Sequence, residues 1–335
     1  MSGPGGFTAG DRALLAGFWH PIAYAAEVGA APFAATLLGE RLVAFRGGGR
    51  LVVARDRCPH RGSALSLGRV VAGELACPYH GLRFAADGRC TAVPAAGPEA
   101  RIPDRLRLDL VESVERYGLL WACLAPPARA PLPDWPALED GRLQKIKMTP
   151  ARWRCSALRH VENFNDVAHF AFVHAGTFGD PDDPLVPAHR VEETPHGLAR
   201  SLAVDQVDRD SFAKGAAPVI RMLYRYDFAL PFASALTIAS PDGRNEHIYD
   251  AVCPEAADRS RIFILKARDY DLDQPADEWI RFQEAVNEED RMIVESQEPA
   301  LPPLDPAAEG HIAADAWSLA FRRRWRALGL GGAPA

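Results

Sequence analysis

Hydrophobic and polar positions along the chain predict two regions of short strands, separated by a proline-rich stretch. In the first region, apolar or alternating runs at 41–46, 51–55 and 82–93 are interrupted by Gly47-Gly48-Gly49 and by the turn pair Asp87-Gly88, which indicates a small all-β unit. The second region predicts an antiparallel sheet from five runs, at 198–204, 219–228, 233–238, 246–253 and 261–268. The five prolines between 125 and 136 break both helix and central strand, so we place the domain boundary there, with domains 1–135 and 136–335.

Two further segments carry helical patterning, which makes α+β the predicted fold class. Residues 157–173 contain neither Gly nor Pro, and a second helix is expected from about 275 to 298. One stripe at helical spacing along the second segment contains Trp279, Phe282, Val286, Ile293 and Gln297, with Asp290 in its middle. A carboxylate on a buried stripe needs a partner. Glu288, Glu289 and Glu295 point away from the stripe and are interpreted as solvated charges.

Charge and composition exclude several classes of partner. Forty-four acidic and 38 basic residues give a formal net charge of -6, which is opposite to the basic excess of nucleic-acid binders and polybasic membrane anchors. No apolar run has the length of a membrane span, and nothing at the N-terminus resembles a secretory signal. Six cysteines in 335 residues are too few for a disulfide framework. We therefore expect a cytoplasmic protein that acts on small molecules.

Two short motifs place Cys and His together in the first region. Cys58-Pro59-His60-Arg61-Gly62 and Cys77-Pro78-Tyr79-His80-Gly81 each hold one thiol and one imidazole in a turn shaped by Pro and Gly. Structural zinc sites usually pair like ligands, whereas a Rieske 2Fe-2S centre binds one iron through two cysteines and the other through two histidines. This pattern assigns Cys58 and Cys77 to one iron, and His60 and His80 to the other. A zinc-ribbon variant, or four unrelated buried residues, is the alternative.

A second group of candidate ligands lies in the helical segment that contains His169 and His174. The two histidines are five residues apart, so both can face one metal only if the helix bends or ends between them. Asp166 lies three residues before His169 and shares its helix face. Two histidines and one aspartate form the facial triad of non-haem Fe(II) oxygenases, and we predict His169, His174 and Asp290 as this triad. The alternative for both histidines is an ordinary core or surface position.

The two Cys-His motifs, together with Glu-Asn-Phe-Asn-Asp-Val-Ala-His-Phe-Ala-Phe-Val-His at 162–174, resemble the terminal oxygenase (alpha) subunits of the Rieske non-haem iron oxygenases. The likeness covers nearly the whole chain. Its length and the segment 289–295 look most like the branch that includes dicamba monooxygenase, vanillate O-demethylase and toluenesulfonate methyl-monooxygenase.

This resemblance implies an N-terminal Rieske domain and a C-terminal helix-grip domain, in which an antiparallel sheet and a long helix enclose a mononuclear Fe(II). It supports Asp290 as the third ligand. It also implies a head-to-tail homotrimer, in which Asp166 links a cluster-ligating histidine of one subunit to His169 of the next. Asn163 occupies a motif position near the iron.

The implied activity is O2-dependent hydroxylation, or O- or N-demethylation, of a small aromatic or heterocyclic substrate. NAD(P)H would act only through a partner reductase or ferredoxin, because the sequence has no Gly-x-Gly-x-x-Gly element. Three alternatives stay open: a cis-dihydroxylating dioxygenase, a non-catalytic Rieske electron carrier, and a zinc-binding structural protein.

Overall fold

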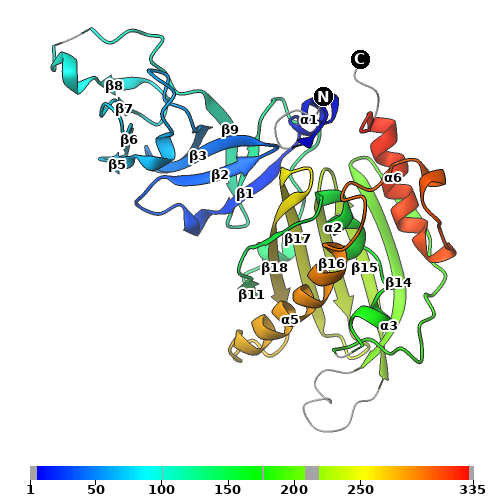
Figure 1. Ribbon diagram of the computed structural model, residues 1–335. Helices are drawn as coiled ribbons and strands as arrows, with labels where there is room; N and C mark the ends of the chain where they lie inside the picture. Colours follow the sequence, from blue (N-terminus) through cyan, green and yellow to red (C-terminus); the bar gives the residue numbers. More distant parts are fainter. Residues whose placement is uncertain (1–5, 100, 176, 208–218, 332–335) are drawn as a thin grey trace. The chain divides into compact units, whose positions relative to one another are not determined.

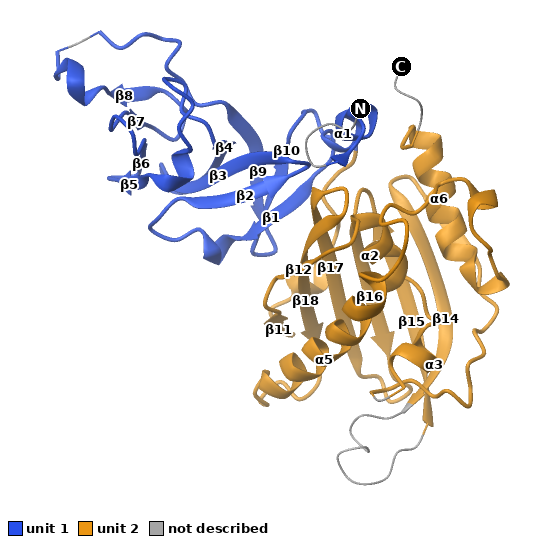
Figure 2. Cartoon of the chain, in the orientation of Figure 1, with its two compact units in different colours: residues 1–129 blue, residues 130–335 orange. Residues whose placement is uncertain are grey.

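Strands dominate both halves of the chain in the computed structural model (Figure 1), which describes residues 6–99, 101–175, 177–207 and 219–331. The chain divides into two units, residues 1–129 and residues 130–335 (Figure 2). The division falls within the proline-rich stretch. Among the described residues, no helix is both long and apolar enough to cross a membrane.

The first unit contains two antiparallel sheets among its described residues, preceded by the helix α1 (Ala9–Leu15). The larger sheet has the order β1-β10-β9-β4-β3-β2, with bounds β1 His20–Tyr24, β2 Phe33–Leu37, β3 Glu40–Gly47, β4 Arg50–Arg55, β9 Leu110–Arg116 and β10 Leu119–Cys123. The smaller sheet has the order β5-β6-β7-β8, with bounds β5 Arg69–Val71, β6 Glu74–Ala76, β7 Arg83–Phe84 and β8 Cys90–Ala92. Gly48 and Gly49 form the β3–β4 turn with φ of 59° and 77°, values that suit the twist of a two-residue hairpin.

The second unit is one antiparallel sheet covered by helices. Its described strands follow the order β11-β18-β17-β16-β15-β14-β13, and β12 also pairs with β18. The strands are β11 Gln144–Lys147, β12 Ala151–Trp153, β13 Val191–Thr194, β14 Gly197–Val207, β15 Val219–Ala229, β16 Ala233–Ala239, β17 Asn245–Ala256 and β18 Arg259–Arg268. The five strands predicted for this region correspond to β14 through β18. This sheet with its helices, together with the first unit's two sheets, confirms the α+β class.

Helices α2 (Ala157–Phe164) and α5 (Asp277–Val294) lie on one face of this sheet (Figure 1). Helix α2 packs against β16, β17 and α5, and the short α3 (Phe170–Val173) packs against α5. Helix α6 (Ala316–Leu328) is held by aromatic contacts, in which Trp317 and Phe321 meet Phe228 at ring-centroid distances of 5.8 and 5.2 Å. The sheet and α5 therefore enclose the space between them, as the helix-grip prediction requires.

The prediction of one helix over 157–173 is wrong. Helix α2 ends at Phe164, because the carbonyl of Asn165 accepts a hydrogen bond from Arg200 and the Asn165 amide donates to Ser234 Oγ at 2.9 Å. A new turn begins after Asp166, whose Oδ2 accepts the backbone N–H of His169 at 2.9 Å. The break separates α2 from α3 and places His169 and His174 at the two ends of α3.

Candidate functional site: two groups of metal-ligating side chains

The two Cys-His motifs fold into equivalent loops. In the first, Cys58 N–H donates to the Ser63 carbonyl at 2.8 Å, and Gly62 N–H donates to the Cys58 carbonyl at 2.8 Å. The second loop repeats this pattern, with Cys77 N–H donating to Leu82 and Gly81 N–H donating to Cys77. Both glycines have positive φ, 74° and 70°, which a side chain at either position would disfavour.

These loops bring the two thiols together and the two imidazoles together. The Cys58 and Cys77 thiols are buried in the unit's apolar core and interact with each other. The rings of His60, which is exposed, and His80, which is half-buried, have centroids 4.8 Å apart. Burial raises the pKa of Cys58 to about 11, and the neighbouring Cys77 thiol adds to the rise. A bound metal would displace the thiol protons, and this donor set, two thiols beside two imidazoles, fits a Rieske cluster.

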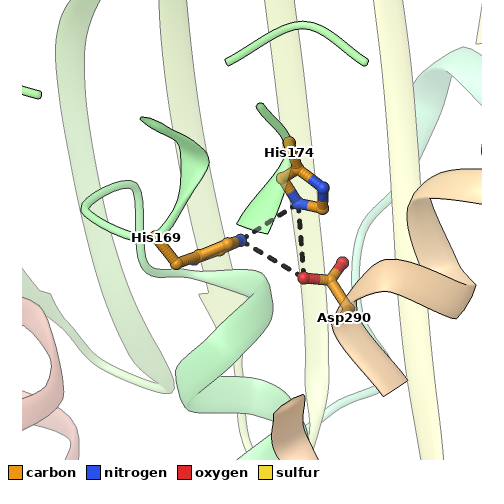
Figure 3. A group of neighbouring side chains, drawn as sticks. All are labelled: His169, His174 and Asp290. Carbon is orange, nitrogen blue, oxygen red and sulfur yellow. Dashed lines mark hydrogen bonds and ion pairs between the residues drawn. The ribbon is translucent and has the colours of Figure 1, made fainter. Parts of the chain in front are cut away.

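The second group lies where α3 and α5 meet over the sheet. Nε2 of His169 and Nε2 of His174 are 3.2 Å apart, and each is 3.3 Å from Oδ1 of Asp290 (Figure 3). Donor atoms about 2.1 Å from one metal ion and at right angles to each other would be about 3.0 Å apart. The three side chains therefore converge on one point with a spacing that fits a metal ion, and two imidazoles with one carboxylate form a 2-His-1-carboxylate face.

Each of these histidines has its other ring nitrogen held by a carboxylate. His169 Nδ1 donates to Asp166 Oδ2 at 2.9 Å, and His174 Nδ1 donates to Glu289 Oε2 at 2.7 Å. Thr177 Oγ1 donates to the Glu289 carboxylate and fixes it in turn. Such partners set the tautomer so that Nε2 carries a lone pair toward the metal. Both Nε2 atoms are thus prepared for ligation.

The predicted third ligand, Asp290, is positioned from α2. Asn163 Nδ2 donates to Asp290 Oδ1 at 3.1 Å. Burial raises the pKa of the Asp290 carboxyl, but His169 and His174 outweigh burial and lower it overall. Burial likewise lowers the pKa of His169, but Asp166 and Asp290 together raise it to about 9. The carboxylates favour positive charge at this point, whether on a proton or on a metal.

A cavity opens beside this triad, between the sheet and α5. Most of its wall is apolar and aromatic, as shown by Phe164, Phe170, Phe178, Tyr224, Trp279 and Phe282. The strands β14 to β18 form the sheet wall of this cavity, and α2, α3 and α5 supply most of the rest of its lining.

Three other residues make contacts that the sequence does not predict. Glu289, predicted to be a solvated charge, instead bonds His174. Glu295, for which the same is predicted, has a carboxylate that is 7% exposed and pairs with Arg154. His160 lines the cavity and forms a buried pair with Asp250, with Nε2 and Oδ2 2.9 Å apart. Position 289 directly precedes Asp290, so only the rotation of α5 against α3 brings it to His174. The local sequence does not predict that rotation.

The helix stripe was predicted only in part. Val286 is buried and Asp290 is 14% exposed, whereas Ile293 is 49% exposed and Gln297 lies beyond the end of α5. The buried positions of α5 are 283, 286 and 294, so the buried face turns away from Ile293 along the helix.

Comparison with known proteins assigns both units. Residues 18–115 match the Rieske [2Fe-2S] domain, and residues 153–330 match the vanillate O-demethylase oxygenase C-terminal domain. The chain is 34% identical over 329 residues to methylxanthine N1-demethylase NdmA of Pseudomonas putida, covering 95% of this chain and 90% of that protein. It is 32% identical to methylxanthine N3-demethylase NdmB of the same species, covering 96% and 91%.

Solved structures agree with these matches. The structure of Pseudomonas putida CBB5 NdmA with caffeine superimposes with a TM-score of 0.84 and 31% identity, covering 94% of this chain and 91% of that one. Dicamba monooxygenase bound to dicamba shares the fold, with a TM-score of 0.81 and 23% identity over 94% and 97%. The likeness first suggested by the Cys-His motifs is confirmed: the chain belongs to the Rieske non-haem iron oxygenases, as a terminal oxygenase (alpha) subunit of the branch that contains demethylases and monooxygenases.

Proposed function

We propose that His169, His174 and Asp290 hold a mononuclear Fe(II), and that Cys58, Cys77, His60 and His80 hold the 2Fe-2S cluster. With these centres the chain would use O2, and electrons from an NAD(P)H-dependent reductase, to hydroxylate or demethylate a small aromatic or heterocyclic substrate. The observation that carries this proposal is the convergence of three ligand atoms, 3.2 to 3.3 Å apart, at the wall of an aromatic cavity.

The ligand side chains need to be rigid before the metal arrives. Asp166 and Glu289 hold His169 and His174 from behind, and Asn163 holds the Asp290 oxygen that faces both imidazoles. When bound, the iron would supply the site at which O2 is activated for attack on a C–H bond. The protein residues orient the ligands and leave the cavity side of the metal face open.

The cavity wall orients the substrate and limits access of water. Aromatic side chains from α2, α3, β15 and α5 surround the space next to the triad, so a planar ring can lie between them with little competing solvent. Oxidation of an N-methyl or O-methyl group there would give a hemiaminal or hemiacetal, which breaks down to formaldehyde and the demethylated ring. The relatives named for N1- and N3-demethylation of methylxanthines and for O-demethylation of vanillate support a methyl group as the point of attack.

Electron supply is the second part of the proposal. Relatives named as iron-sulfur subunits of the toluene-4-sulfonate monooxygenase system support a multicomponent enzyme with a separate reductase. We propose a cytoplasmic homotrimer in which Asp166 connects His169 to a cluster histidine of the neighbouring subunit. The intrachain half of this connection is the 2.9 Å bond from His169 Nδ1 to Asp166 Oδ2, and the Asp166 side chain is 26% exposed, which leaves it accessible to a partner.

The experiment is a reconstituted turnover assay. The purified chain, loaded anaerobically with iron, is mixed with a Rieske-oxygenase reductase, NADH or NADPH, and a panel of N-methyl, O-methyl and unsubstituted aromatic compounds. Formaldehyde formed in step with O2 consumption supports demethylation, and an alcohol from a methyl group supports hydroxylation. A cis-diol would instead favour the dioxygenase alternative, for which the 33% identity to 3-chlorobenzoate-3,4-dioxygenase over 61% of the chain is a reason. Reduction of the cluster without any O2-dependent product, on an iron-loaded protein, would favour the electron-carrier alternative.

A further inference from the structure

One wall of the cavity is polar, in contrast to its aromatic surroundings. Glu246 on β17 and Lys266 on β18 form an ion pair inside the cavity, with residue exposures of 7% and 2%. A buried ion pair is usually no more stabilising than apolar residues of the same size, because both charges lose their hydration. Its position in a ligand cavity therefore suggests a role in recognition.

This ion pair is the start of a directional chain of hydrogen bonds that leads to α5. Lys266 Nζ donates to Gln283 Oε1 at 3.1 Å, and Gln283 Nε2 donates to Asn287 Oδ1 at 2.9 Å. An ammonium group can only donate, so it fixes the carbonyl end of the Gln283 amide toward itself and the amino end toward Asn287. The Asn287 amide is oriented in the same way, because its oxygen accepts the hydrogen bond from Gln283 Nε2 and its amino group must therefore point elsewhere.

The chain of bonds ends in a donor. Asn287 lines the cavity, and in the described part of the protein its Nδ2 amide has no acceptor, while its Oδ1 accepts from Gln283. Asn287 is three residues before Asp290 on α5, so both side chains lie on one side of the helix. A ligand that fills the space beside the triad is therefore within reach of an N–H that is oriented in advance.

The charges on this wall compensate each other. Glu246 neutralises Lys266 at contact distance. Arg244, which also lines the cavity, pairs with Asp242 at 2.7 Å and stacks on Tyr270 at 5.4 Å. Such a wall offers donors and acceptors without a net charge that would attract an anion.

We propose that Asn287, oriented by the chain Glu246–Lys266–Gln283, is a specificity-determining residue, and that the cavity takes a neutral planar ring with a hydrogen-bond acceptor, such as a ring carbonyl, near the oxidised carbon. This inference rests on the proposed function, because it takes the triad as the position of the reacting carbon. A matched acceptor contributes about one net hydrogen bond, which corresponds to about a tenfold preference over an isosteric ring that lacks it.

The test measures binding without turnover. The full-length protein, loaded with iron and kept oxidised without reductase, is titrated calorimetrically with three rings of similar shape: 1-methyl-2-quinolone, 1-methylnaphthalene and the anion 1-methyl-2-naphthoate. We expect the quinolone to bind about tenfold more tightly than methylnaphthalene, and the naphthoate to gain nothing over methylnaphthalene. Asn287→Leu, which keeps the volume but removes the donor, should bring the ratio of quinolone to methylnaphthalene affinity close to one.

Two further variants separate recognition from a general change in the cavity. Ile238→Val alters an apolar lining residue and should leave the ratio unchanged. The double variant Lys266→Met/Glu246→Leu removes both charges together, so neither is left buried alone. It should lower the ratio because the Gln283 amide can then rotate and exchange its oxygen and nitrogen.

The inference is overturned if the quinolone binds no more tightly than methylnaphthalene, if the preference survives Asn287→Leu, or if the naphthoate binds best. Failure of the proposed function would be seen differently, as an iron content per chain that leaves no iron for the mononuclear site.

Discussion

The two groups of candidate metal ligands in this chain are built in opposite ways. In the first unit, each loop supplies a thiol and an imidazole within three or four residues, and the same backbone hydrogen bonds shape both loops. In the second unit, the candidate ligands come from the two ends of α3 and from α5, which are far apart in the sequence. The first site is therefore determined by local turns, and the second by how helices pack on a sheet.

The candidate ligands of the two units also differ in their exposure to solvent. His60 is exposed and His80 half-buried, whereas His174 is 1% exposed and Asp290 is 14% exposed. An imidazole at the surface suits exchange of electrons with a partner, and a buried triad beside an aromatic cavity suits chemistry that must exclude water. The proposed electron-accepting site and the proposed substrate site therefore have separate structural supports within one chain. Each can therefore be removed without the other.

The largest expected effect is loss of the cluster alone. Cys58→Ser should remove the Rieske absorbance and EPR signal and abolish turnover, because a serine hydroxyl does not replace a thiolate on iron. About one iron per chain should remain, bound at the triad. Cys90→Ser, at a half-buried cysteine outside both loops, is the control and should keep the signal. Loss of both iron sites in Cys58→Ser would show that the two supports are not separate.

The converse change is His169→Ala. It should leave the Rieske spectrum intact and lower the iron content from about three to about two per chain, with loss of turnover, since a single histidine and a carboxylate do not retain the metal. Metal analysis and EPR of the same sample measure both results. His196→Ala, at an exposed histidine, provides the comparison. Unchanged iron content in His169→Ala would remove this residue from the ligand set.

A smaller effect is expected at Asp166, the proposed link between the two sites. Asp166→Asn should leave both centres loaded, yet lower the turnover rate about 100-fold. The asparagine oxygen can still accept a hydrogen bond, but the uncharged amide does not replace a carboxylate as the link between two histidines. Single-turnover kinetics of cluster oxidation would show the block directly. Asp182→Asn, on an exposed part of the following loop, should have no such effect. Turnover like that of the wild type in Asp166→Asn would disprove the bridging role.

The support behind His174 gives a further, smaller change. Glu289→Gln keeps an acceptor for His174 Nδ1 but removes the charge, so the affinity for Fe(II) should fall about tenfold. Chelator competition measures this affinity independently of turnover. Glu288→Gln is the matched control on the same helix, since Glu288 is 54% exposed and forms its ion pair with Arg291, away from the histidines. Equal Fe(II) affinities in both variants would contradict the supporting role of Glu289.

The smallest effect concerns stability of the first unit. Burial lowers the pKa of His20 to about 4, although the bond to the Leu15 carbonyl opposes the shift. The unfolded chain, with a histidine pKa of about 6.5, binds more protons than the folded one between these values, so stability is lost as pH falls from about 6.5 to about 4. Between pH 7 and pH 5.5 this costs about 1 kcal/mol. Denaturant unfolding followed by Rieske absorbance should show it, and His20→Gln should remove that part of the pH dependence.

Sequence reasoning succeeded where the determinants are local. The turn glycines, the alternating strands β14 to β18 and the two Cys-His loops all depend on neighbouring residues. Asp290 is predicted as a ligand from helix periodicity and the family likeness, and the structure places its Oδ1 3.3 Å from both histidines.

The remaining features depend on tertiary packing. The end of α2 requires Arg200 of β14 to reach Asn165, and the ion pair Glu246–Lys266 requires the register of β17 on β18. The contact of Glu289 with His174 requires α5 to be rotated correctly against α3. These three contacts join residues far apart in the chain, so no local pattern predicts them.

The most direct test of two separately supported metal sites is a stoichiometry. The full chain, purified without oxygen and reconstituted with Fe(II), is analysed for iron and acid-labile sulfide, and its EPR spectrum is recorded after reduction. We expect about three irons and two sulfides per chain together with a Rieske signal. About two irons that persist after reconstitution would contradict the mononuclear site, and zinc in place of iron would contradict both sites.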